Sequence, residues 1–109
     1  MPKKEVMIIA IERDPELTLH EICHVCGTTS DLVQELIAYG TIDVQTMDST
    51  RWRFNSQHVR LIRRVLHLQH DLQVNLPGAL LAIDLMSQIE VLKAEIDVLE
   101  KYLMAAQSS

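Results

Sequence analysis

Residues that bind transition metals cluster near the start of the chain, as His20, Cys23, His24 and Cys26. Thiolate sulfur and imidazole nitrogen are the usual ligands of structural zinc, but such a site needs four ligands, generally as two separated pairs. The sequence has no second cysteine pair, and its remaining histidines lie far along the chain. A thioredoxin-like redox role would need a βαβ context, which the sequence lacks. We therefore predict core and surface packing for these residues, and no metal site.

A second pair of histidines, His67 and His70, lies beside Asp71. No nucleophile lies near them in sequence, and the chain contains no paired-carboxylate, glycine-rich phosphate-binding or nucleophile-elbow motif. We expect no catalytic residues and no cofactor, so the protein is predicted not to be an enzyme.

Charge is distributed unevenly along the chain, whose 10 basic and 15 acidic residues give a net charge of −5. That balance argues against a protein that coats nucleic acid or an anionic membrane. No Lys or Arg occurs between Arg13 and Arg51, and the next five basic residues form the one basic patch: Arg51, Arg53, Arg60, Arg63 and Arg64. These arginines could hold phosphates or an acidic protein, or they could neutralise the acidic surface around them; the sequence leaves both interpretations open.

Two short helices are predicted across the acidic part of the chain. Thr18 and Glu21 form a capping-box pattern that begins the first helix, and Gly27 ends it. Ser30 or Thr29 caps the second helix, which Gly40 ends. Two helices joined by a glycine-containing turn are a helix-turn-helix candidate, although such a pair can also serve only to build a core.

Extended segments are predicted on both sides of this helix pair. The β-branched apolar run 6–11 indicates an N-terminal strand, and the alternation over 41–54 indicates a small β-hairpin, or wing. Asn55 or Ser56 then begins a third helix. The expected fold class is therefore mainly α, a winged helix-turn-helix domain over residues 1–75.

A long final helix is predicted over residues 76–106, with Pro77 in its first turn and a disordered tail at 107–109. Aliphatic residues recur in it at steps of three and four, which is typical of a coiled coil. We call this set the C-terminal stripe: Leu85, Ile89, Leu92, Ile96, Leu99 and Leu103. We predict that it forms a homodimer, although it could instead dock on its own domain. Flanking charges mildly favour an antiparallel pair.

The apolar run 6–11 is too short for a signal-peptide core or a membrane span. We therefore expect a cytoplasmic protein that does not associate with membranes.

The order of these parts resembles the MerR-like family of chaperone modulators typified by CbpM. The resemblance rests on the Cys23–Gly27 turn, the Trp52-x-Phe54 pair, HDLQVNLPG at 70–78 and AIDLM at 82–86. It implies a MerR-like winged helix-turn-helix fold followed by a dimerisation helix. It also implies a homodimer that binds the J-domain of a DnaJ-like co-chaperone such as CbpA and blocks its engagement of Hsp70 (DnaK).

A J-domain resembles a helical hairpin with a basic second helix, so acidic residues of this chain are expected to face it. The expected partner-binding residues are Glu21, Asp31, Glu35, Asp71 and Asp84.

The alternative is a MerR-family DNA-binding regulator. MerR transcription factors resemble one another in a TLRYY segment, where this chain reads LVQEL at 32–36 and lacks the arginine and both tyrosines. Nucleic acid is therefore not the expected partner. Under the alternative, phosphates would be held by Arg51, Arg53, Arg63 and Arg64.

Overall fold

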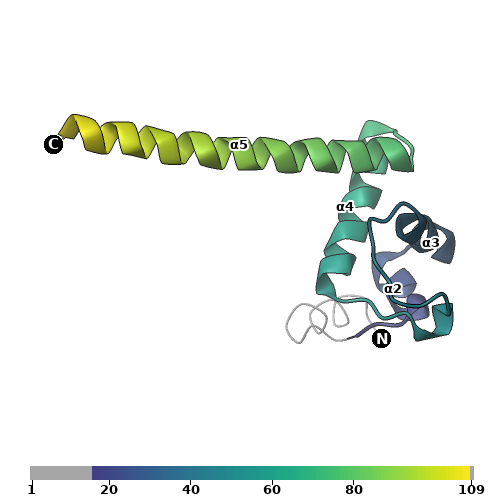
Figure 1. Ribbon diagram of the computed structural model, residues 1–109. Helices are drawn as coiled ribbons and strands as arrows, with labels where there is room; N and C mark the ends of the chain where they lie inside the picture. The colour runs from purple at the N-terminus through teal and green to yellow at the C-terminus, as the bar shows by residue number, and fades with distance from the viewer. Residues whose placement is uncertain (1–15, 109) are drawn as a thin grey trace. The chain divides into compact units, whose positions relative to one another are not determined.

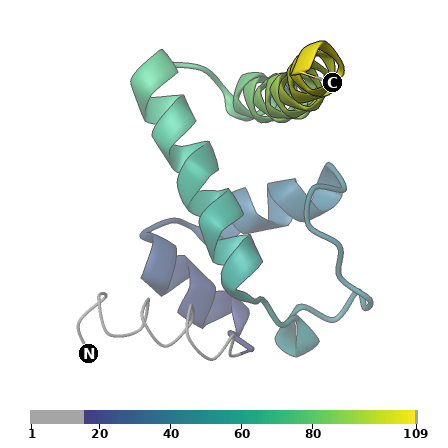
Figure 2. The ribbon, with the colours of Figure 1, turned by 90° about the vertical axis from the view of Figure 1, so that its left-hand side faces the viewer.

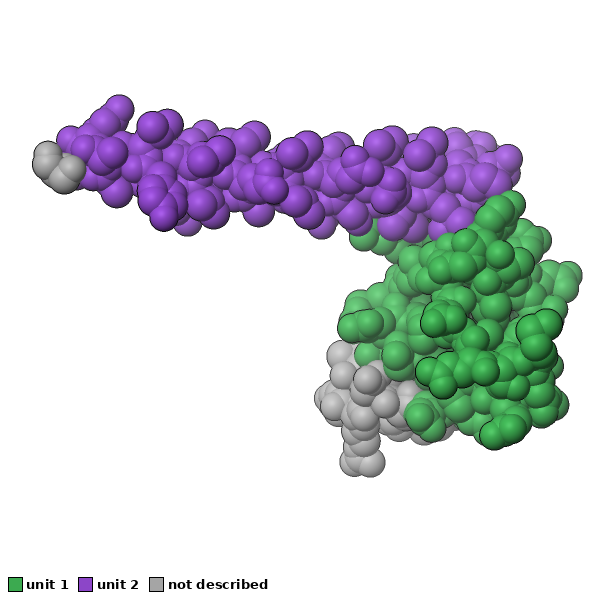
Figure 3. Space-filling model, in the orientation of Figure 1, with its two compact units in different colours: residues 1–66 green, residues 67–109 purple. Residues whose placement is uncertain are grey.

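Helices dominate the part of the chain that the computed structural model describes, residues 16–108 (Figure 1). In chain order the elements are α2 (Leu19–Cys26), α3 (Ser30–Ala38), the 3-10 turn η1 (Ser49–Arg51), α4 (Ser56–Leu72) and α5 (Leu76–Ser108). The chain divides into two units, residues 1–66 (unit 1) and 67–109 (unit 2), shown in different colours in Figure 3. The predicted strand at 6–11 lies outside the described residues. No helix of the described range is long and apolar enough to cross a membrane.

The capping box predicted for the first helix is present. The hydroxyl of Thr18 accepts a hydrogen bond from the backbone N–H of Glu21 at 3.2 Å, and Oε1 of Glu21 accepts one from the N–H of Thr18 at 2.9 Å. Gly27 ends α2 with φ of 67°, a left-handed conformation that glycine adopts without steric cost. These local interactions fix both ends of α2 and confirm the predicted boundaries.

The second helix also begins and ends where its caps require. Thr29 accepts a hydrogen bond from the N–H of Leu32, and Gly40 follows the helix with φ of 77°. The N–H of Thr41 then donates to the carbonyl of Leu36 at 2.9 Å, which closes the helix in a Schellman-type turn. Because Gly27 ends α2 and Thr29 caps α3, the two helices are joined by the short glycine-containing turn that the sequence predicted.

The predicted β-hairpin over residues 41–54 is wrong. Within the described chain this segment forms a loop that contains η1, with no strand. Its one backbone pairing is an isolated antiparallel bridge between Leu17 and Phe54, with N···O distances of 2.7 and 2.8 Å. The two arms of the loop are joined by the indole N–H of Trp52, which donates to the carbonyl of Thr46 at 2.8 Å.

Burial explains why this loop alternates in sequence like a hairpin. Ile42 and Phe54 are each 1% exposed and fill the core of unit 1, while their neighbours face outward. A loop that crosses a core surface can therefore show the period of two that a half-buried strand shows.

The core of unit 1 lies where α2 and α3 gather around the N-terminal half of α4 (Figure 2). Phe54 is its one large aromatic side chain, and the edge of the Trp52 ring lies against it at a centroid distance of 6.5 Å. The aliphatic residues buried with it are Leu17, Ile22, Val25, Val33, Leu36, Ile42, Val59, Ile62 and Val65.

Unit 2 contains the sharp break between α4 and α5. Asn75 caps α5, since its Oδ1 accepts a hydrogen bond from the N–H of Gly78 at 2.9 Å. Pro77 lies in the first turn, where the absence of an N–H costs nothing. A Cβ at Gly78 would lie 3.1 Å from Cβ of Val74 and 3.2 Å from the Asn75 oxygen, so this turn leaves little room for a side chain. Helix α5 continues to Ser108, two residues past the boundary that the sequence predicted.

We expect Thr18→Ala to lower the free energy of unfolding by about 1 kcal/mol, because the N–H of Glu21 loses its hydrogen-bond acceptor. Chemical denaturation of the full chain measures this change. Thr41→Ala is the matched control, since Thr41 is exposed outside the helices and its hydroxyl caps none of them. Equal losses in the two variants would contradict a capping role for Thr18.

Candidate functional site

Two exposed carboxylates lie one turn apart on α3. Asp31 is in the first turn of the helix and Glu35 follows four residues later, with the exposed Gln34 between them. Neither acid forms an ion pair within the described part of the chain. Like charges at positions i and i+4 repel each other, so an external cation placed between them would relieve that repulsion. We call Asp31, Gln34 and Glu35 the acidic α3 face.

Glu21 differs from these two acids because its carboxylate already has a structural role. The hydrogen bond from the backbone N–H of Thr18 lowers the pKa of Glu21, and the Thr18 hydroxyl and the more distant charge of Arg53 act in the same direction. Because its pKa is lowered, Glu21 keeps its charge to a lower pH than an unperturbed glutamate does. Its side chain is held at the start of α2, so it can add negative potential to a surface but is less free to reorient toward a partner.

The other two predicted partner-binding acids lie in unit 2. Asp71, at the end of α4, lies 3.3 Å from Nδ1 of His70. Asp84, on α5, accepts a hydrogen bond from Nε2 of Gln88 at 2.9 Å. Both acids are exposed. The five acids therefore form two sets on different units, Glu21, Asp31 and Glu35 on unit 1 and Asp71 and Asp84 on unit 2.

The C-terminal stripe is uncovered within unit 2. Every residue from 84 to 108 is exposed, and the six stripe residues are between 48% and 63% exposed. Fully burying one such side chain contributes about 1.5–3 kcal/mol, so covering the remaining half of six side chains contributes roughly 5–9 kcal/mol before the cost of association. A surface of this kind is a candidate site for binding a second helix.

Helix α5 carries a second apolar face that was not predicted from the sequence. Val91 is 57% exposed and Val98 is 53% exposed, and both line an apolar hollow of about 520 Å³. The signal was present in the sequence as a further set of apolar residues at steps of three and four. This pattern was hard to recognise because its residues alternate in sequence with those of the longer C-terminal stripe.

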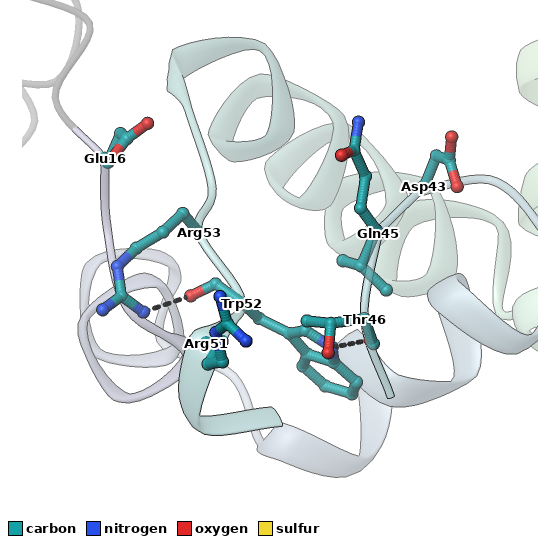
Figure 4. A pocket seen from close by; sticks show the side chains of 8 residues that line it. Glu16, Asp43, Gln45, Thr46, Arg51, Trp52 and Arg53 are labelled. Atoms are coloured by element: carbon teal, nitrogen blue, oxygen red, sulfur yellow. Dashed lines mark hydrogen bonds between the residues drawn. The ribbon is translucent and has the colours of Figure 1, made fainter. Parts of the chain in front are cut away.

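A polar hollow of about 630 Å³ lies between the two arms of the loop after α3 (Figure 4). Arg51 and Arg53 lie on one side of it, and Nη1 of Arg53 donates to the carbonyl of Trp52 at 2.7 Å. The other lining residues are Glu16, Asp43, Val44, Gln45, Thr46 and Trp52. Two acids therefore offset the two arginines, so the hollow is not strongly selective for phosphate.

The remaining arginines of the alternative phosphate site lie elsewhere in unit 1. Arg63 and Arg64 are on α4, and neither is among the residues that line this hollow. The structure therefore brings Arg51 and Arg53 together and places the other two on a separate element.

The histidine and cysteine cluster lies along α2. His20, Cys23 and His24 border a shallow hollow at the end of that helix. Partial burial raises the pKa of the Cys23 thiol, which disfavours the thiolate that metal binding or nucleophilic attack requires. Among residues 16–108, no group of three or more His, Cys, Asp or Glu side chains is arranged to hold a metal ion.

Comparison with known proteins gives relatives over most of this length. The chain is 26% identical to the chaperone modulatory protein CbpM of Coxiella burnetii over 102 residues, 94% of this chain and 96% of that protein. It is 28% identical to the chaperone modulatory protein CbpM of Escherichia coli O139:H28 over 78 residues, 72% of this chain and 77% of that protein. Residues 17–101 match the family described as MerR HTH family regulatory protein. Since this match spans the helix pair, α4 and most of α5, the chain belongs to the MerR helix-turn-helix family.

Proposed function

We propose that the protein is a non-catalytic modulator that binds the J-domain of a DnaJ- or CbpA-like co-chaperone and blocks its engagement of Hsp70 (DnaK). The observation that carries the proposal is the acidic α3 face. A DNA-reading helix exposes Arg, Lys, Asn or Gln toward the base pairs, whereas α3 exposes two carboxylates without ion-pair partners among the described residues. Similarity to two chaperone modulatory proteins over most of the chain supports the class of partner.

Electrostatic complementarity gives this surface a physical role. A partner with a basic helix would be attracted to Asp31 and Glu35, with Glu21 adding to the negative potential of unit 1. Such attraction mainly raises the association rate and selects the partner, while apolar contacts supply most of the affinity. A bound modulator would then cover the basic surface that the co-chaperone needs for Hsp70.

We further propose that the C-terminal stripe forms a homodimer. A second copy supplies a helix of the same length and the same aliphatic composition, so the two stripes can interdigitate along their full extent. An antiparallel pair with Ile96 near Leu99 of the partner subunit would set Lys93 opposite Glu100 of the partner subunit.

Reversing both charges, Asp31→Lys with Glu35→Lys, is expected to weaken binding of the J-domain about tenfold or more. Binding of the variant should also depend less on salt, because the attraction that salt screens has been removed. Titration calorimetry at low and moderate ionic strength measures both effects. Glu16→Lys with Asp43→Lys changes the net charge equally from another exposed part of unit 1 and serves as the control. Unchanged binding in the α3 variant, or an equal loss in the control, would remove the acidic α3 face from the interface.

Ile96→Asp is expected to convert the dimer into a monomer, because it places a charge in the centre of a buried seam. Sedimentation velocity measures the mass of the species. Met104→Asp makes the same apolar-to-acidic change on α5 outside the C-terminal stripe and should leave the mass unchanged. A dimer that persists in Ile96→Asp would show that another surface holds the two copies together.

The second candidate function, DNA binding, is favoured by the family match and by the convergence of Arg51 and Arg53 on one hollow. We expect no specific complex with genomic DNA fragments in a gel-shift assay at moderate salt, since the acidic α3 face would repel the phosphates. A sharp complex that fades steeply as salt rises, and that Arg51→Ala with Arg53→Ala removes, would replace the modulator proposal with the regulator.

A further inference from the structure

Helix α5 carries a second apolar face besides the C-terminal stripe. Its members follow one another at steps of three and four residues, and we call them the second stripe: Val91, Ala94, Val98, Tyr102 and Ala105. All five are exposed, Tyr102 to 73%. At 100° per residue, the second stripe lies about 140° around the helix from the C-terminal stripe. A helix that pairs through one stripe therefore leaves most of the other accessible, and Leu99 of the C-terminal stripe lies at the border between them.

The second stripe has a dent that fits a side chain of another helix. The hollow of about 520 Å³ is lined by Val91, Ala94, Glu95, Val98 and Leu99. The small side chain of Ala94 lies between the two valines along the stripe, which leaves room for a bulky apolar side chain of another helix. Figure 3 shows the length of α5 with no other segment of unit 2 packed on the face in view, and residues 84–108 are all exposed.

Acidic residues border the second stripe on both sides. At the same helical spacing, Asp84 and Glu95 lie along one edge, while Glu90 and Asp97 lie along the other. Two lysines lie near the second of these edges. Lys101 is paired with Asp97, with its Nζ 3.0 Å from the carboxylate, and Lys93 is three residues from Glu90 and four from Asp97. The edges of the second stripe therefore carry an excess of negative charge.

This charge pattern argues against a second copy of α5 as the helix that binds the second stripe. In an antiparallel pair each edge of the stripe meets the same edge of the other copy, so Glu95 and Asp84 would approach acids. In a parallel pair one acidic edge meets the other. Both arrangements bring like charges together, which is destabilising.

We propose that the second stripe binds an amphipathic helix of a partner protein, one whose apolar seam is flanked by Lys and Arg. The apolar seam fills the dent at Ala94, and the flanking cations lie along the two acidic edges. The C-terminal stripe of the same α5 remains free to pair with a second copy. The inference rests on the proposed function only for the identity of the partner, since the basic second helix expected of a J-domain has this chemistry.

The test uses the full chain and a synthetic 18-residue amphipathic helix of Leu and Lys as the probe, with fluorescence anisotropy as the readout. The unsubstituted protein is expected to bind the peptide, and Val91→Ser with Val98→Ser is expected to weaken binding at least tenfold without changing the sedimenting species. Met86→Ser with Met104→Ser makes the same kind of change on α5 outside both stripes and should bind normally. Ala94→Lys keeps a good helix former, places a charge in the dent and should weaken binding by a similar factor.

Three results would overturn the proposal. They are no binding by the unsubstituted protein, unchanged binding in both stripe variants, or a change in the sedimenting species of a stripe variant, which would show that the second stripe binds another copy of the chain.

A parallel titration with a J-domain separates this inference from the proposed function. If Asp31→Lys with Glu35→Lys loses the J-domain while the stripe variants keep it, the proposed function stands and the stripe inference is wrong. If the peptide binds through the stripe and no J-domain binds, the stripe inference stands and the proposed function is wrong.

Discussion

The constraint on which the rest of the structure depends is the exposure of aliphatic surface along α5. The helix has 33 residues, about 50 Å at 1.5 Å per residue, and every residue from 84 to 108 is exposed. Water-exposed stripes of Leu, Ile and Val on so small a chain cannot be covered by unit 2 itself, whose buried apolar residues are Leu76 and Ala79. Covering this surface therefore requires a contact from outside unit 2, and the proposed homodimer would supply one.

Unit 1 is stabilised differently, because its short helices pack around one small core. Helices of 8 and 9 residues are marginal in isolation, so caps and burial have to supply their stability. Thr18, Glu21, Thr29 and Asn55 satisfy backbone N–H groups that would otherwise lack partners. The acidic character of this unit thus has two origins. Glu21 and Asp48 hold the starts of α2 and η1, while the acids of the acidic α3 face contribute nothing visible to packing.

The sequence predicted those features that local interactions determine. Caps at Thr18 and Thr29, the left-handed glycines and the break at Asn75 each depend on a few neighbouring residues, and the structure confirms them. The wing was wrong because its alternation reflects burial of Ile42 and Phe54 in a core built by distant helices. The second stripe on α5 was missed because two overlapping periodic patterns on one helix look like general hydrophobicity. The partner-binding role of the acids is a property of a complex, and no arrangement within one chain can determine it.

Trp52 is the sole tryptophan of the chain, and its position has a spectroscopic consequence. The indole is half-buried, its N–H donates to the carbonyl of Thr46, and its ring edge lies against Phe54. Because indole emission responds to local polarity and hydrogen bonding, fluorescence excited selectively from Trp52 reports on the loop after α3. Ligands in the hollow beside Arg51 would shift the emission, whereas α5 itself contains no tryptophan. The protein thus carries a built-in optical probe that distinguishes its two kinds of surface.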